Sequence, residues 1–146
     1  MTCCFFGHHD ISENIKPSIE IAVRNLINIE GVTDFLVGNQ GLFDSMVLSV
    51  LRKLKSEYPD ISYKVVFAYF PTAKNDFVPL EPIETIYPEG LETAPKRFAI
   101  SKRNDWMLRR SDIVICYVWH HFGGSSQFVT KAIKQNKRVI NLYEKA

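Results

Sequence analysis

The chain has 146 residues, of which 46% are hydrophobic and 23% are charged, and its formal net charge is +2 at pH 7. This size and composition predict one compact domain over residues 1–146 rather than two domains or a disordered segment. The charge is too mild to indicate a nucleic-acid partner, and no apolar stretch has the ~18 residues of a bilayer span. Three cysteines form no even-numbered disulfide framework and no signal-peptide pattern precedes them, so we expect a cytoplasmic protein.

The first half of the chain alternates short apolar runs with stretches of helical periodicity. Residues 3–6 predict a strand, and the apolar residues within 15–29 recur at helical spacing. Residues 34–37 predict a second strand, which an amphipathic helix over 43–54 follows. Residues 63–69 are rich in β-branched and aromatic side chains and predict a third strand.

The alternation is interrupted once and then resumes. Residues 70–97 carry five prolines and show no sustained period apart from a short strand expected at 84–87, so they predict a long loop. A connection of this length often binds a ligand or closes over a site as a lid. The remaining elements are expected in the order helix 98–110, strand 113–119, helix 126–135 and strand 137–142.

Strands that alternate with helices predict an α/β fold in three layers. We expect a mainly parallel sheet of about five strands with helices on both faces, because each crossover returns a strand beside its predecessor. Ligands of such sheets bind beyond the carboxyl ends of the strands.

Three glycine-bearing loops follow predicted strands and would meet at that edge. The first contains Gly7 and His8 at residues 6–9, the second spans 37–41, and the third spans 122–126. The third loop offers backbone N–H groups and hydroxyls at a helix N-terminus, which is a phosphate-binding arrangement. Alternatively, its glycines make the turn and a serine caps the helix. Its candidate ligand-binding residues are Gly123, Gly124, Ser125 and Ser126.

The second loop is the candidate site for a base or ribose. Gly38 and Gly41 let the backbone approach a ligand, while the amides of Asn39 and Gln40 can donate and accept hydrogen bonds together. Asp44 could bond a ribose hydroxyl, or it could complement the dipole of the helix that begins here.

Basic and aromatic residues add further candidates. Arg97, Arg103 and Asn104 follow the long loop, and a guanidinium fork there could clamp an anionic group of the ligand. The alternative is a solvated helix face. Tyr69 could stack on a base, and His8 could contact a phosphate or serve a structural role. The four histidines form two adjacent pairs whose side chains point apart on an extended chain, so we expect no metal site.

Taken in order, these loops resemble the SLOG superfamily, which contains the LOG phosphoribohydrolases and DprA. The match rests on residues 3–8, 35–44, 95–104, 111–115 and 123–126, and it is closest to small single-domain bacterial members. The resemblance implies a Rossmann-like fold, a nucleotide-type ligand and a homo-oligomer. His9 is a departure, because relatives commonly carry an arginine after Gly-His.

A second departure concerns catalysis. LOG-type hydrolases follow their Gly-Gly-x-Gly-Thr loop closely with a glutamate, whereas no Asp or Glu occurs here between Asp112 and Glu144. Cleavage of an N-glycosidic bond needs a positioned carboxylate or an equivalent base, so this loop cannot supply the LOG mechanism.

Three functions therefore compete. The first is a non-catalytic or weakly catalytic sensor or binding module for a nucleotide-derived small molecule, for which we expect no cofactor. The second is a nucleotide-processing enzyme, such as an N-glycoside hydrolase, that uses Asp44 or a glutamate from the loop at 81–92. The third is an interaction domain for a protein or single-stranded DNA, although the modest charge argues against nucleic acid.

Overall fold

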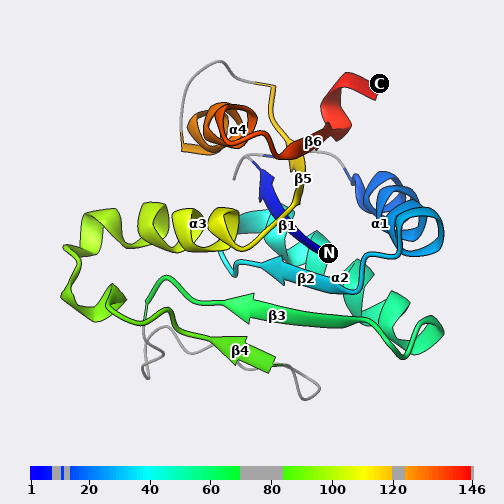
Figure 1. Cartoon of the computed structure of the whole chain (residues 1–146), viewed down its shortest axis with the longest axis horizontal. Helices are drawn as coiled ribbons and strands as arrows, with labels where there is room; N and C mark the ends of the chain where they lie inside the picture. Colours follow the sequence, from blue (N-terminus) through cyan, green and yellow to red (C-terminus); the bar gives the residue numbers. More distant parts are fainter. Residues whose placement is uncertain (8–10, 12–13, 70–83, 120–123, 146) are drawn as a thin grey trace.

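The computed structural model describes residues 1–7, 11, 14–69, 84–119 and 124–145. They form one parallel sheet with the strand order β4-β3-β2-β1-β5-β6 (Figure 1). The strands are β1 (Thr2–Gly7), β2 (Asp34–Val37), β3 (Ser62–Val66), β4 (Glu84–Ile86), β5 (Ile113–Tyr117) and β6 (Arg138–Asn141). The α-helices are α1 (Lys16–Glu30), α2 (Gly41–Glu57), α3 (Ala99–Arg109) and α4 (Gly124–Lys134). Short 3₁₀ helices are η1 (Leu91–Thr93), η2 (Lys96–Phe98) and η3 (Leu142–Lys145).

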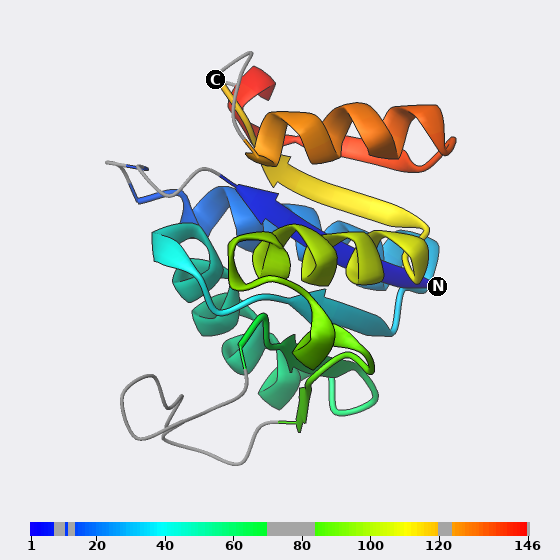
Figure 2. The same ribbon diagram turned by 90° about the vertical axis from the view of Figure 1, so that its left-hand side faces the viewer.

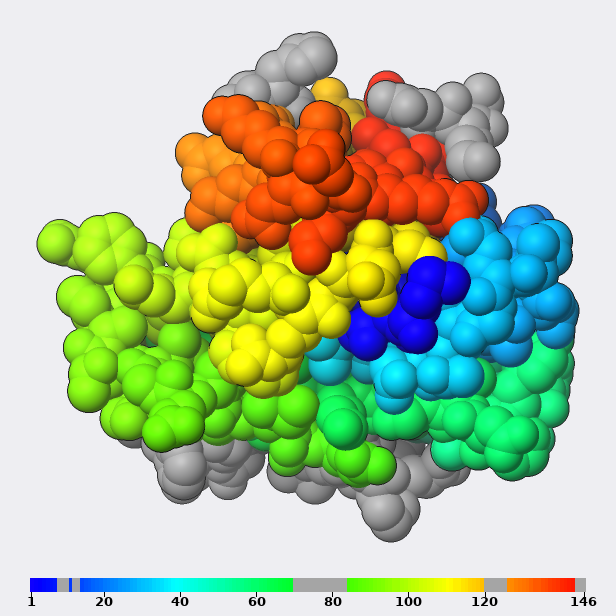
Figure 3. All heavy atoms as spheres, in the orientation of Figure 1, coloured from blue at the N-terminus to red at the C-terminus, as the bar shows by residue number. Residues whose placement is uncertain are grey.

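The sheet lies between two layers of helices (Figures 1 and 2). Because successive strand residues point to opposite faces, Cys3 and Phe5 of β1 pack with α1 and α2, whereas Cys4 and Phe6 pack with α3 and α4. The space-filling view shows the same order of elements at the surface, from β3 and β4 at one rim to α4 and β6 at the other (Figure 3). The expected three-layer α/β fold is confirmed.

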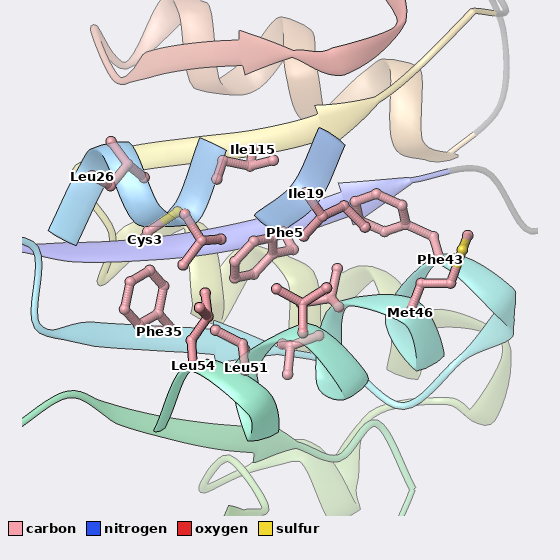
Figure 4. Close-up of a cluster of buried hydrophobic side chains, with 14 of the residues drawn as sticks. Cys3, Phe5, Ile19, Leu26, Phe35, Phe43, Met46, Leu51, Leu54 and Ile115 are labelled. Carbon is pink, nitrogen blue, oxygen red and sulfur yellow. The ribbon is translucent and has the colours of Figure 1, made fainter. Parts of the chain in front are cut away.

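The larger core cluster lies on the face that α1 and α2 cover (Figure 4). Phe5 and Phe35 of neighbouring strands stack there with ring centroids 6.2 Å apart, and Leu51 and Leu54 of α2 are fully buried against them. Truncating one such leucine to alanine typically costs about 2–5 kcal/mol, so this cluster fixes α2 and the loop that precedes it.

The structure corrects several expected boundaries. The sheet has six strands in the described residues rather than about five, because the short strand expected near residue 84 pairs with β3. β3 was expected to reach Tyr69 but ends at Val66, since neither neighbouring strand continues beyond that point: Val37 pairs with Val65, and Ile86 pairs with Val66. No helix in the described part of the chain is long and apolar enough to cross a membrane.

The strand order reverses at β1. Strands β2, β3 and β4 follow on one side of it, whereas β5 and β6 lie on the other. All strands run parallel, so their carboxyl ends share one edge of the sheet, where Figure 1 shows the arrowheads and the beginning of α3. In open α/β sheets a crevice for ligands forms at such a reversal, between the loops that leave the two diverging strands.

Candidate functional site

A small cavity opens at this edge of the sheet. Its volume is about 30 Å³, which holds roughly one or two water molecules. It is lined by Phe5, Phe6, Gly7, Gln40, Asp44, Ile100, Arg103, Asn104 and Met107. The cavity therefore brings together five of the predicted site residues from four different elements of the chain.

Arg103 is the buried cation of the cavity. It shares the inward face of α3 with Ala99 and Met107 at four-residue spacing, and only 2% of it is exposed. Its Nη1 donates a hydrogen bond to the carbonyl oxygen of Val66 at 2.9 Å, and its Nε donates to Oδ1 of Asn104 at 2.8 Å. Arg103 thereby ties α3 to the carboxyl end of β3.

Burial lowers the pKa of Arg103, whereas the negative charge of Asp44 and the nearby Tyr69 oppose this effect. An arginine stays protonated in proteins, so the guanidinium remains a cation among largely buried groups. The carboxylate of Asp44 is the acidic group whose charge acts on it.

Asp44 lies in the first turn of α2 and is 8% exposed. Its Oδ2 accepts a hydrogen bond from the backbone N–H of Gln40 at 2.9 Å, just before the helix begins. The carboxylate thus lies in the first turn of α2, where the helix-dipole role that we expected as one alternative would act. Its role toward a ribose stays a prediction.

Two glycines allow the loops to approach other parts of the protein closely. A Cβ on Gly38 would lie 2.4 Å from Nη1 of Arg103 and 2.8 Å from Oδ2 of Asp44. A Cβ on Gly7 would lie 2.3 Å from Cγ of Phe43. Real Cβ atoms do not approach other atoms this closely, so any larger residue at either position would displace the ring or the buried charge pair.

Asn39 carries an acceptor that the described residues leave unused. Its Oδ1 is buried, and no hydrogen-bond donor reaches it within the described part of the chain. A buried acceptor without a donor costs about 1–3 kcal/mol, so a donor at this position stabilises the loop.

Gly41, the first residue of α2, is exposed and has a φ of 88°, which glycine adopts readily.

Two of the basic and aromatic candidates, Tyr69 and Arg97, lie outside the cavity lining. Tyr69 is half-buried; its hydroxyl lies 3.5 Å from the carbonyl oxygen of Lys96, and the Lys96 ammonium is 5.9 Å from its ring centroid. Arg97 is exposed in η2, with its guanidinium carbon 4.8 Å from the ring centroid of Phe98. Arg97 is therefore separate from the buried Arg103, although both were predicted as anion clamps.

The third predicted loop is described in part. Gly124 and Ser125 begin α4, and Ser126 is half-buried in its first turn. His8 and Gly123 lie outside the described residues, as do the other three histidines. Within the described segments, no group of three His, Cys, Asp or Glu side chains could hold a metal ion.

Sequence reasoning missed the apolar wall of the cavity and the ring beneath Gly7. Ile100 and Met107 were predicted only as helix residues, and Phe43 only as part of an amphipathic helix. One signal was available. The four-residue spacing of Ala99, Arg103 and Met107 places the arginine on the buried face of α3.

Comparison with known proteins gives one informative result. No protein-family model matches the chain, and no curated protein matches it. Among solved structures, the X-ray structure of DNA processing protein A (DprA) from Streptococcus pneumoniae superposes with a TM-score of 0.67 at 15% sequence identity. The match covers 94% of this chain and 48% of that one, so this chain spans about half the length of its structural neighbour. The two share a Rossmann-like fold.

Proposed function

We propose that this protein binds a nucleotide or a nucleotide-derived small molecule at the carboxyl edge of its sheet, as a sensor or ligand-binding module. The observation that carries this proposal is the polar cavity at the carboxyl edge of the sheet, beside the end of β1. Gln40, Asp44, Arg103 and Asn104 meet there beside Gly7. Hydrogen-bonding groups of both kinds beside a fixed charge favour a polar ligand that both donates and accepts.

The ligand extends from the cavity along the edge of the sheet, because the cavity alone is water-sized. In this proposal a ribose hydroxyl supplies the donor that Oδ1 of Asn39 lacks among the described residues. A phosphate binds at the N-terminus of α4, where Ser126 lies in the first turn. Arg103 acts mainly by positioning Asp44 and the backbone at Gly38. From the same loops, we also propose that this chain is related to the SLOG superfamily.

Calorimetric titration of nucleoside phosphates into matched variants tests the proposal. Asn104→Leu removes a polar group of the cavity, whereas Asn25→Leu makes the same change at an exposed site on α1. We expect Asn104→Leu to weaken binding at least roughly tenfold, which corresponds to 1.4 kcal/mol, and Asn25→Leu to leave it unchanged. Ser126→Asp should abolish binding of a phosphorylated ligand by charge repulsion. Equal affinity of all variants for the nucleotide would contradict the proposed binding site.

A second candidate is a nucleotide-processing enzyme, favoured by the carboxylate of Asp44 in the cavity. A carboxylate beside an N-glycosidic bond could stabilise an oxocarbenium-like transition state. Release of free base from a nucleoside monophosphate, lost in Asp44→Asn while the ligand still binds, would support this candidate. Absence of turnover across the common monophosphates would leave binding as the function.

A third candidate is binding of single-stranded DNA. Phe98 is 45% exposed next to Arg97, and Tyr69 lies below Lys96, so aromatic and cationic groups adjoin each other near the same edge. Stacked bases and neutralised phosphates make such binding sensitive to salt. Retardation of an oligonucleotide that is weakened by salt and by Phe98→Ala would support it. Retardation that neither salt nor Phe98→Ala weakens would count against this candidate.

A further inference from the structure

The strand β6 forms an open edge of the sheet. Among the described residues it pairs with β5 on one side and with no strand on the other (Figure 1). The backbone N–H of Arg138 donates to the carbonyl oxygen of Asp112 at 3.2 Å, so Arg138 faces β5. Because main-chain groups of successive residues alternate in direction, those of Val139 face the open side. An open edge of this kind can accept another strand.

One groove lies beside this edge on the face that α1 covers. It has a volume of about 350 Å³ and includes Ile21, Ala22, Leu26, Ile140 and Leu142 in its lining. Ile21 is 63% exposed although it is a large aliphatic residue. The groove therefore offers apolar surface directly beside the strand.

A second groove flanks the same strand on the face that α4 covers. It has a volume of about 560 Å³, and its lining combines Val129, Ile133 and Val139, of which Ile133 is 61% exposed, with the polar residues Asn136, Lys137, Arg138 and Asn141. Ile140 packs with the α1 face of the sheet and Val139 with the α4 face. A strand added to β6 would place alternate side chains into the two grooves.

The charged residues beside β6 indicate which kind of partner this edge could accept. Lys137 and Arg138 lie in the lining of the grooves, and Glu30, which forms an ion pair with Arg138, is the acidic residue there. Two copies of this chain paired along β6 would join two edges of the same positive sign, which gives no attraction between them. A segment with acidic residues would be attracted instead.

We propose that β6 is a docking site for an extended, acidic segment of a partner protein, which adds to the sheet as a seventh strand. Main-chain hydrogen bonds to Val139 give affinity, and apolar side chains enter the grooves beside Ile21 and Ile133. Acidic residues at the ends of the segment pair with Lys137 and compete with Glu30 for Arg138. This surface is separate from the cavity and does not depend on its ligand.

Fluorescence anisotropy with a labelled synthetic peptide tests the proposal. The probe alternates valine and threonine and carries two glutamates at each end, so that both strand directions present acidic residues to β6. A matched peptide carries lysines in their place, and a third has a central proline. The whole protein is compared with Val139→Pro, which removes the outward N–H that the peptide needs and is tolerated at a sheet edge. A second variant, Ile133→Glu, keeps that N–H and places charge in a groove.

We expect the acidic peptide to bind and the lysine peptide to bind at least roughly tenfold more weakly. The proline peptide, Val139→Pro and Ile133→Glu should each reduce binding by a similar factor, while the far-ultraviolet circular dichroism of the variants stays native. Equal binding of acidic and lysine peptides, or no binding of either, would overturn the proposal. So would sedimentation of the wild type as a dimer that Val139→Pro dissociates, since a second copy would then occupy the edge.

Discussion

Gly38 lies directly against the guanidinium of Arg103, so that a Cβ at Gly38 would come within 2.4 Å of Nη1. This contact joins the loop after β2 to the inward face of α3. Since Asp44 adjoins the same point, the candidate site is built around a buried charge pair that the glycine accommodates.

Gly38→Ala should therefore destabilise the fold. The added methyl must displace Arg103 or Asp44, and overpacking of this kind costs about 1–3 kcal/mol. Urea unfolding measures the loss. Ser45→Ala, an exposed change in the same region, should stay within about 0.5 kcal/mol of the wild type. A Gly38→Ala protein as stable as that control would show that the contact is not rigid.

Arg103 and Asp44 should behave as a coupled pair. Arg103→Met leaves the Asp44 carboxylate without its nearby cation and should cost roughly 3 kcal/mol, as removal of one member of a buried pair does. The double variant with Asp44→Asn should lose less than the sum of the two single changes. Arg109→Met, exposed on the same helix, is the control. Additive losses would contradict the coupling.

Acid should weaken the contact between α1 and α2 before it affects the core. A hydrogen bond from Lys53 lowers the pKa of Glu20, and hydrogen bonding to Arg24 lowers that of Glu57. Since these pKa values are lower in the folded state, their stabilisation is present above the ordinary value of 4.5 and is lost as pH falls through the lowered values.

Thermal unfolding between neutral and acidic pH tests this expectation. In Arg24→Met, the unfolding midpoint should fall less steeply below about pH 4.5 than in the wild type. High salt should have the same effect on the wild type, because salt screens exposed charges. If the unfolding midpoint falls equally with pH in Arg24→Met and in the wild type, other carboxylates cause the loss of stability.

The cysteines should be unreactive in the folded protein. Cys3, Cys4 and Cys116 are all buried, and burial raises the pKa of Cys4 to about 12. The thiolate is the nucleophile, so iodoacetamide at mildly alkaline pH should modify these residues only after guanidinium chloride unfolds the chain. Mass spectrometry counts the adducts. Fast labelling of the native protein would show that the core around β1 and β5 opens readily.

The alternating pattern of the sequence was sufficient to predict the fold class. Phe5 and Phe6 lie on a fully buried strand, and the helical spacing from Phe43 onward continued through α2. The order of the strands was beyond this reasoning, because local periodicity does not encode which strands become neighbours. The same limit explains β3, whose length depends on where β2 and β4 end beside it.

Part of the polar lining of the cavity was predictable from the sequence, but its geometry was not. The loop after the second strand indicated Asp44, and the helix after the long loop indicated Asn104, and both residues line the cavity. Burial of Arg103 depends on the packing of α3 against β3, and the contact between Gly7 and Phe43 depends on the angle between a strand and a helix. Neither relationship can be read from residue types alone.

The central claim is that the cavity edge binds a nucleotide-type ligand, and one thermal unfolding experiment tests it most directly. The protein is heated with nucleoside mono-, di- and triphosphates, NAD, ADP-ribose and cyclic nucleotides in parallel. A ligand at about 100 times its dissociation constant stabilises a protein by roughly 2.7 kcal/mol. We predict a selective rise in the midpoint with one class of these compounds. An unchanged midpoint with every compound would contradict the claim.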